Sequence, residues 1–244
     1  MRILLASDLH YTLRQYDWIA SQADRFDAVV IAGDHLDVVG AVPADAQIVA
    51  IRTTLAHLAE RSRLVTCSGN HDLNALNAAG EKTADWLEPL RERGAIVDGD
   101  TATIGDTTFS VLPWWDGDVA RAGVEAQLEA AEPERAGRWV WVYHSPPQGL
   151  LSWTGSRHFG DPALAGWIDR WTPEVVLTGH IHQSPFTEDG SWVDQVGSTW
   201  LFNAGKQIGD VPARIELDLG TAEALWVSLA GEERRSFELR PVAQ

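Results

Sequence analysis

Five apolar segments of the chain end in residues of the types that bind metal ions. The five ends read Asp8-Leu9-His10, Gly33-Asp34, Gly69-Asn70-His71-Asp72, Tyr143-His144-Ser145-Pro146 and Gly179-His180-Ile181-His182. Five of the eight histidines fall at these positions, which would not be expected of histidines scattered over a surface. Imidazoles mixed with carboxylates and an amide oxygen suit manganese, iron or zinc better than calcium or magnesium. The sequence therefore predicts a metal centre.

The segments that carry these ends have the character of buried strands. Runs such as RILLAS at 2–7, AVVIAG at 28–33 and EVVLTGH at 174–180 are short and rich in aliphatic residues. Helices are predicted between them, over residues 44–61, 83–92, 117–131 and 161–171. From about residue 190 onward the pattern changes to strands joined by tight turns. This order predicts a layered α/β fold with a mixed sheet, or two sheets packed together. The carboxyl ends of the strands would then meet at one crevice.

More ligands are available than one ion needs. The seven candidates are Asp8, His10, Asp34, Asn70, His144, His180 and His182. Their number points to two divalent metal ions per chain that share a bridging carboxylate. Paired ions of this kind serve in-line displacement at phosphorus.

The ordered set of motifs resembles the signature of the calcineurin-like metallophosphoesterase superfamily. That signature is Asp-x-His, Gly-Asp-x-x-Asp, Gly-Asn-His-Asp/Glu, a later His and Gly-His-x-His, and here it runs from Asp8 to His182. The stretch from Tyr143 to His182 further resembles small prokaryotic members of the superfamily. The resemblance implies an α/β fold of two packed mixed β-sheets flanked by helices, a four-layer αββα sandwich.

The resemblance also implies roles for individual residues. One metal would be held by Asp8, His10, Asp34 and His182. The other would be held by Asp34, Asn70, His144 and His180, so that Asp34 bridges the two. His71 would stand beside the metals as a catalytic residue and not as a ligand.

Residues next to the motifs are candidates for supporting roles. Asp37 and Asp72 are expected to orient ligands through hydrogen bonds. Substrate contacts are expected from three further residues. His35 follows Asp34 where an apolar residue would be usual, Trp114 follows a strand that should end near the crevice, and His158 lies in the loop GSRHFG.

Length and composition limit the classes of protein and of partner that are expected for this chain. The 244 residues contain no long linker or internal repeat, so a single domain over 1–244 is expected. The formal net charge of −16 argues against a track for a nucleic-acid backbone. No run approaches 18 apolar residues, so no membrane span is expected. The lone cysteine, Cys67, allows no intramolecular disulfide, and a cytoplasmic location is the simplest expectation. The oligomeric state is not indicated.

These observations predict a dinuclear-metal hydrolase of a small or nucleotide-like phosphoester, with a phosphodiester preferred. A water bridging two metals becomes a hydroxide near neutral pH and would attack phosphorus. His71 is placed to protonate the departing oxygen as a general acid. Two alternatives are a protein phosphoserine phosphatase with the same site and a non-catalytic metal-binding scaffold of the same fold. A scaffold would have no reason to retain His71 together with every ligand.

Overall fold

Two six-stranded β-sheets lie face to face in the computed structural model, which describes residues 1–132, 135 and 137–240. The first sheet has the order β14-β13-β12-β1-β2-β3 and the second has the order β10-β11-β9-β8-β7-β6. Three neighbouring strands of the first sheet and four of the second are parallel, and the remaining strands pair antiparallel. Both sheets are therefore mixed, as the sequence predicts.

The first sheet combines strands from the two ends of the chain. Its strands are β1 (Arg2–Ala6), β2 (Ala28–Ala32), β3 (Leu64–Cys67), β12 (Arg214–Asp218), β13 (Glu223–Ser228) and β14 (Gly231–Ser236). Strands β1, β2 and β3 are parallel, with Leu5 opposite Val30 and Val30 opposite Val65. Their carboxyl ends consequently lie at one edge of the sheet.

The second sheet is built from the middle of the chain. Its strands are β6 (Thr101–Ile104), β7 (Thr107–Val111), β8 (Arg138–Val142), β9 (Val175–Thr178), β10 (Val193–Val196) and β11 (Thr199–Asn203). Strands β7, β8, β9 and β11 are parallel. A separate short hairpin is formed by β4 (Ala75–Leu76) and β5 (Lys82–Thr83).

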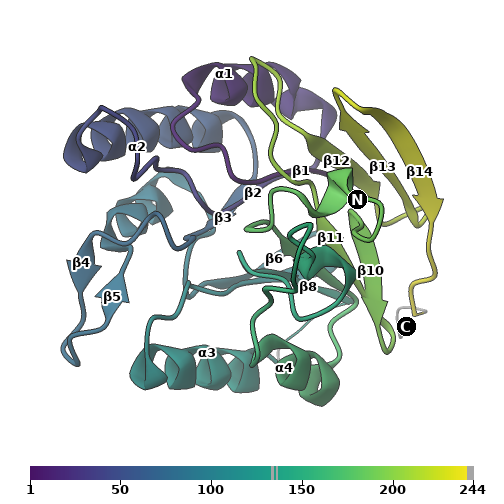
Figure 1. The fold of residues 1–244 in the computed structure, drawn as a ribbon. Coiled ribbons are helices and arrows are strands. Elements are labelled where there is room, and N and C mark those ends of the chain that lie inside the picture. Colours follow the sequence, from purple (N-terminus) through teal and green to yellow (C-terminus); the bar gives the residue numbers. More distant parts are fainter. Residues whose placement is uncertain (133–134, 136, 241–244) are drawn as a thin grey trace.

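Helices cover the outer face of each sheet. The α-helices are α1 (Leu13–Gln22), α2 (Ala44–Arg61), α3 (Asp118–Ala131) and α4 (Leu164–Trp171). Shorter 3₁₀ segments are η1 (Ala23–Arg25), η2 (Asp85–Arg93), η4 (Leu150–Ser152) and η5 (Ser184–Phe186). Figure 1 shows α1 and α2 on one side of the two sheets and α3 and α4 on the opposite side.

Three apolar clusters separate these four layers. The middle cluster joins the inner faces of both sheets, with residues such as Leu5 and Val30 meeting Val140 and Phe202. A second cluster packs the first sheet against α1, α2 and η2, and a third packs the second sheet against α3 and α4. The four-layer αββα sandwich predicted from the sequence is thus confirmed.

The helix predictions hold for α2 and α3 and need correction elsewhere. Most of the predicted helix 83–92 is instead the 3₁₀ segment η2 (Asp85–Arg93), and Thr83 belongs to β5. Segment η2 contains Pro89, and proline lacks the N–H that an α-helical turn requires. Helix α4 begins at Leu164, because the preceding residues form a turn in which Asp161 accepts N–H groups from Ala163 and Leu164. Helix α1 was not predicted, since its buried face contains only Gln15, Tyr16 and Ile19.

None of the helices within the described ranges is both long enough and apolar enough to cross a membrane.

Candidate metal centre

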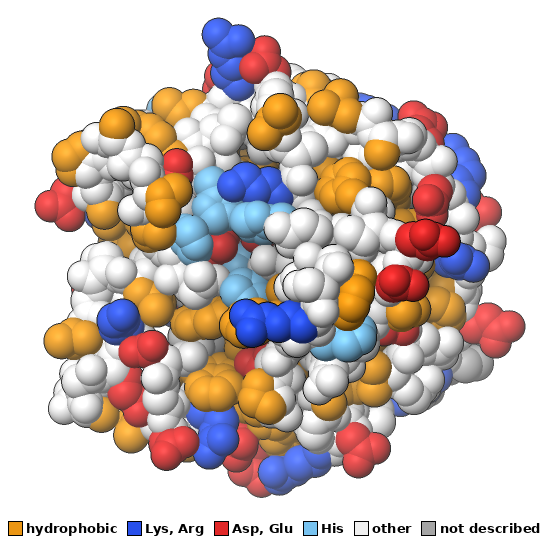
Figure 2. Space-filling model, in the orientation of Figure 1, with side chains coloured by type: hydrophobic (Ala, Val, Ile, Leu, Met, Phe, Trp, Pro, Cys, Tyr) orange, Lys and Arg blue, Asp and Glu red, His pale blue; other side chains and the backbone are white. Residues whose placement is uncertain are grey.

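The predicted ligands all follow strands at the edge where the parallel carboxyl ends of both sheets meet. Asp8 and His10 follow β1, Asp34 follows β2 and Asn70 follows β3 in the first sheet. From the second sheet, His144 follows β8, and His180 and His182 follow β9. Figure 2 shows histidine side chains gathered at the bottom of a hollow on this face, with acidic side chains among them. The sandwich thus brings together residues that lie up to 174 positions apart in the chain.

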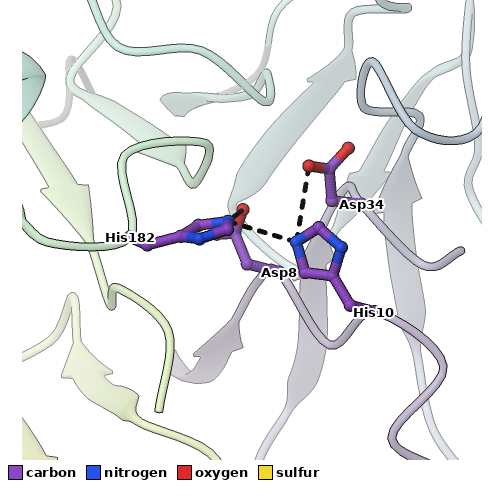
Figure 3. A group of neighbouring side chains, drawn as sticks. All are labelled: Asp8, His10, Asp34 and His182. Carbon is purple, nitrogen blue, oxygen red and sulfur yellow. Dashed lines mark hydrogen bonds and ion pairs between the residues drawn. The ribbon is translucent and has the colours of Figure 1, made fainter. Parts of the chain in front are cut away.

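Asp8, His10, Asp34 and His182 form the first of two groups of possible ligands (Figure 3). The His10 Nε2 and His182 Nε2 atoms lie 3.1 Å apart, and His182 Nε2 lies 3.2 Å from Asp8 Oδ1. His10 Nε2 lies 3.6 Å from Asp34 Oδ2. Three of the four side chains are buried, and His182 is partly exposed.

Asp34, His144 and His180 form the second group. His144 Nε2 lies 3.2 Å from Asp34 Oδ2, and the rings of His144 and His180 lie 5.1 Å apart. The buried side-chain oxygen of Asn70 has no hydrogen-bond partner among the described residues. A buried polar atom without a partner is costly and calls for an explanation such as a bound ion.

The donor atoms of both groups fit a divalent ion. Two ligands at right angles on one ion, each about 2.1 Å away, lie about 3 Å apart. The separations of 3.1 and 3.2 Å within the two groups have this size. His144 supports the same interpretation, because its Nδ1 lies 2.6 Å from the Ala32 carbonyl oxygen and donates to it, which leaves Nε2 to face the centre. These residues would therefore hold metal ions, with Asp34 common to the two groups.

Two of the candidate ligands are neutral imidazoles at neutral pH. Burial lowers the pKa of His10 and that of His180 to about 4, although nearby carboxylates act in the opposite direction. Both imidazoles are then uncharged at neutral pH, with a lone pair available for an ion.

The pKa of His144 is shifted in the opposite direction. Burial alone would lower its pKa, but the charge of Asp34 and a hydrogen bond to it outweigh burial and raise the pKa of His144 to about 9. Burial would likewise raise the pKa of Asp34, but the charge of His144 keeps the pKa of Asp34 well below its usual range. In the metal-free chain His144 and Asp34 thus form an ion pair, and an ion that binds there must displace the proton of His144.

Four of the candidate ligands adopt strained backbone conformations. Asp8, His10, Asp34 and His180 have φ values of 57°, 41°, 54° and 68°. Residues other than glycine rarely adopt this left-handed region, at a cost of about 1–3 kcal/mol each. Strain of this kind persists only where the surrounding structure enforces it, and here it turns side chains at the strand ends into the crevice.

Glycines of the motifs leave space for the side chains of the candidate ligands. A Cβ atom at Gly69 would lie 2.2 Å from Asp34 Oδ1, and one at Gly33 would lie 2.5 Å from His144 Nδ1. A Cβ atom at Gly179 would lie 2.7 Å from Asp8 Oδ2. Each distance is shorter than real Cβ contacts, so each ligand can occupy its position only because a glycine lies beside it.

His71 lies next to the shared carboxylate. Its backbone N–H donates to Asp34 Oδ1 at 3.0 Å, and its Nε2 lies 3.9 Å from Asp34 Oδ2. Its ring packs edge-on against the ring of His10, with 4.6 Å between the centroids. The side chain is partly exposed, so it can be reached from the crevice.

Asp72 ties together two of the ligand-bearing loops. Its fully buried carboxylate accepts N–H groups from His35 at 2.9 Å, Leu36 at 3.0 Å and Gly69 at 2.8 Å. This connects the loop after β2 with the loop after β3. The Asp37 carboxylate instead accepts an N–H from Val39 within its own loop.

The substrate contact expected at His35 is corrected by the structure. The residue is fully buried, with its ring nitrogens 3.0 Å from the Tyr16 hydroxyl and 2.8 Å from the Thr66 hydroxyl. Asp34 has a left-handed φ of 54°, and the side chain that follows it lies in the interior between Tyr16 of α1 and Thr66 of β3, not in the crevice. His35 therefore supports the loop from below.

Aromatic side chains border the half of the centre that contains His144 and His180. The ring of Trp114 lies 5.2 Å from that of His180 and 5.8 Å from that of His144. Phe159, which is half exposed, lies 5.6 Å from the ring of His180. Sequence reasoning selected His158 from this loop and missed Phe159. The exposed His158 contacts Trp153 and the Gly149 carbonyl instead. Nothing in the sequence distinguished Phe159, a single apolar residue next to the polar candidate His158.

Most of the chain matches one known protein family. Residues 1–217 match the model of the calcineurin-like phosphoesterase superfamily domain. Comparison with curated proteins finds no match.

Several solved structures have a similar fold. TT1561 of Thermus thermophilus is 15% identical with a TM-score of 0.59, and the match covers 96% of this chain and 98% of that one. A dimetal phosphatase from Danio rerio is 11% identical with a TM-score of 0.60, covering 98% and 99%. The purple acid phosphatase PPD1 from yellow lupin (Lupinus luteus) is 12% identical with a TM-score of 0.55, covering 98% of this chain and 52% of the lupin chain. At these identities the likeness concerns the fold alone.

Proposed function

The chain belongs to the calcineurin-like phosphoesterase superfamily of metal-dependent phosphoester hydrolases, and we propose that it uses a dinuclear centre to hydrolyse a small phosphoester. The two ions would be manganese, iron or zinc, in keeping with the mixture of imidazole and carboxylate donors. Asp8, His10, Asp34 and His182 would hold one ion, and Asp34, Asn70, His144 and His180 would hold the other.

The observation that carries this proposal is the position of Asp34 between the two groups of donors. Its Oδ2 atom lies 3.6 Å from His10 Nε2 on one side and 3.2 Å from His144 Nε2 on the other. A single ion would not need both groups, whereas two ions would share this carboxylate. When bound, such a pair supplies Lewis acidity toward phosphoryl oxygens and a water acidic enough to act as a nucleophile near neutral pH.

The residues of the chain hold the reacting groups in place. Asp8 is fixed by a 2.6 Å hydrogen bond from the Ser7 hydroxyl and by the His180 N–H at 3.1 Å from both carboxylate oxygens. Asp34 is fixed by the N–H of His71. A centre held by buried, hydrogen-bonded ligands needs little rearrangement during the reaction.

His71 is the residue that we assign to proton transfer. It is next to the shared carboxylate, its side chain is accessible from the crevice, and its buried Nδ1 has no hydrogen-bond partner among the described residues. A proton donated to the departing oxygen would remove the need to expel an alkoxide. The His71 backbone is bound to Asp34, and its ring packs against that of His10, so the imidazole lies beside the centre.

Two aromatic side chains beside His180 could contact the substrate. Trp114 and Phe159 offer aromatic surfaces on which a base or an aryl leaving group could stack. The sequence favoured a phosphodiester, but the ligand set by itself accepts phosphoryl oxygens of a diester or a monoester. The choice between these two classes therefore depends on the side chains around the centre.

The test is metal analysis together with a substrate panel. Protein stripped with a strong chelator is reloaded with manganese, iron or zinc, and is then assayed on aryl phosphomonoesters, aryl phosphodiesters and a phosphoserine peptide. We expect two ions per chain, loss of activity on chelation and its return with manganese. Hydrolysis that survives thorough chelation would contradict the dinuclear proposal. Full loading without turnover of any ester would identify a scaffold, and preference for the phosphopeptide would identify a protein phosphatase.

A further inference from the structure

Lys206 is a cation without a partner at the rim of the metal centre. It is one of only two lysines in the chain, the other being the exposed Lys82. Lys206 is half-buried, and its ammonium makes neither an ion pair nor a hydrogen bond with any residue in the described ranges. Its ammonium therefore has no protein partner in the described part of the chain to compete with an anion that enters the crevice.

The backbone that carries Lys206 is rigidly attached to the ligand loop after β9. The N–H of Lys206 donates to the His182 carbonyl oxygen at 3.3 Å. The fully buried Asn203 donates to the Ile181 carbonyl at 3.0 Å and accepts the Gly205 N–H at 2.8 Å. On the other side, the indole of Trp226 donates to the Ala204 carbonyl at 3.0 Å. The fold thus places the backbone of this lysine at a fixed distance from His182.

Lys206 lies beside the centre, because its backbone is bound to that of the candidate ligand His182. Figure 2 shows Lys or Arg side chains directly beside the gathered histidines, in an otherwise acidic molecule. A cation beside the centre repels metal ions, so it opposes the loading of the site instead of assisting it. An anion that lies between Lys206 and bound metal ions would be attracted by both.

We propose that Lys206 binds a non-bridging oxygen of the phosphoryl group of the substrate and makes the centre prefer phosphomonoesters to phosphodiesters. This rests on the proposed function. A phosphomonoester carries a charge of about −1.5 to −2 at pH 7, whereas a diester carries one negative charge. The attraction to a fixed ammonium grows in proportion to the charge on the substrate, so Lys206 stabilises the monoester more. The sequence motifs favoured a phosphodiester substrate, and Lys206 is not part of those motifs.

The first experiment measures binding without turnover. The zinc-loaded protein is labelled with ¹³C at the lysine ε carbons, so that two lysine signals are observed, and it is titrated with inorganic phosphate. We expect the Lys206 signal to shift with saturation and the Lys82 signal to stay in place. The variant Lys206→Met should bind phosphate about 10- to 100-fold more weakly, the range typical of a lost charge-assisted hydrogen bond. Lys82→Met is the matched control and should bind phosphate as the unaltered protein does.

Metal affinity separates this role from a merely structural one. Lys206→Met removes a repelling charge, so it should bind manganese or zinc as tightly as the unaltered protein or more tightly. A lysine that only supported the loop would weaken metal and phosphate binding together, and that result would overturn the proposal. Equal phosphate affinity in Lys206→Met and Lys82→Met would overturn it as well.

Kinetics test the substrate preference. With matched nitrophenyl esters, Lys206→Met should raise KM and lower kcat/KM about 10- to 100-fold for the monoester, with a distinctly smaller loss for the diester. Equal losses for the two esters would refute the preference. If the unaltered protein hydrolysed neither ester, the proposed function would fail, while the phosphate titration would still decide whether Lys206 binds the anion.

Discussion

Replacement of Gly69 by alanine should damage the metal centre without touching a ligand. The added Cβ would lie 2.2 Å from Asp34 Oδ1 and 2.6 Å from the Asp34 backbone nitrogen. Ordinary contacts would require Asp34 or the Gly69 loop to move by roughly 1 Å. Neither can move freely, because the Gly69 N–H is bound to buried Asp72 and Asp34 is bound to the His71 N–H.

The size of the effect follows from this geometry. Overpacking of a closely packed site costs about 1–3 kcal/mol in the free energy of unfolding. Displacement of a reacting group by about 1 Å can lower activity about 10²-fold. Because Asp34 belongs to both groups of donors, Gly69→Ala should weaken the binding of both ions and not only one.

Urea unfolding and calorimetric metal titration would measure these changes. Gly166→Ala is the matched control, since Gly166 is exposed on α4 and a Cβ there meets nothing within 4 Å. That control should keep metal binding and gain about 0.5–1 kcal/mol of stability, as expected for glycine to alanine within a helix. If Gly69→Ala bound two ions with unchanged affinity, the tight contact between Gly69 and Asp34 would not control the site.

Two further predictions concern proton transfer and pH. His71→Ala should keep both ions while kcat falls about 10²- to 10⁴-fold, with a smaller loss for nitrophenyl esters, whose leaving group needs little protonation. An empty metal position in this variant, or equal losses for activated and unactivated esters, would show that His71 is not a general acid. The pKa of His144 is raised to about 9 in the metal-free chain, so below that pH a metal ion must displace the proton of His144. The affinity for metal should therefore fall by up to tenfold per pH unit as the pH drops from about 9 toward 6. Calorimetry in buffers of different ionisation enthalpy should detect about one proton released near pH 7, and release of none would mean that His144 is already neutral.

The sequence contained most of the information about the ligands because the motifs stand at strand ends. Parallel strands bring their carboxyl ends to one edge, so Asp8, Asp34 and His180 could be placed together without knowing the sheet order. The apolar spacing of Ile48, Ile51 and Leu55 likewise predicted α2 over its full length. These are local patterns, and tertiary structure did not override them.

Other features depend on contacts that no local pattern reveals. Helix α1 is held by tertiary contacts, among them the Gln15 amide bound to the carbonyl oxygens of Gln207 and Gly209. The interior position of His35 depends on its contacts with Tyr16 and Thr66, which belong to other elements of the fold. Lys206 lies 24 residues beyond His182 in the sequence, and only the pairing of β9 with β11 brings its loop back to the centre.

The central claim is that Asp34 joins two metal ions, and a metal-loaded crystal structure compared with the variant Asp34→Ala tests it most directly. We predict two ions per chain with the Asp34 carboxylate in contact with both, and loss of metal binding together with activity in Asp34→Ala. A fully loaded structure with one ion, or with two ions of which Asp34 touches only one or neither, would contradict the claim.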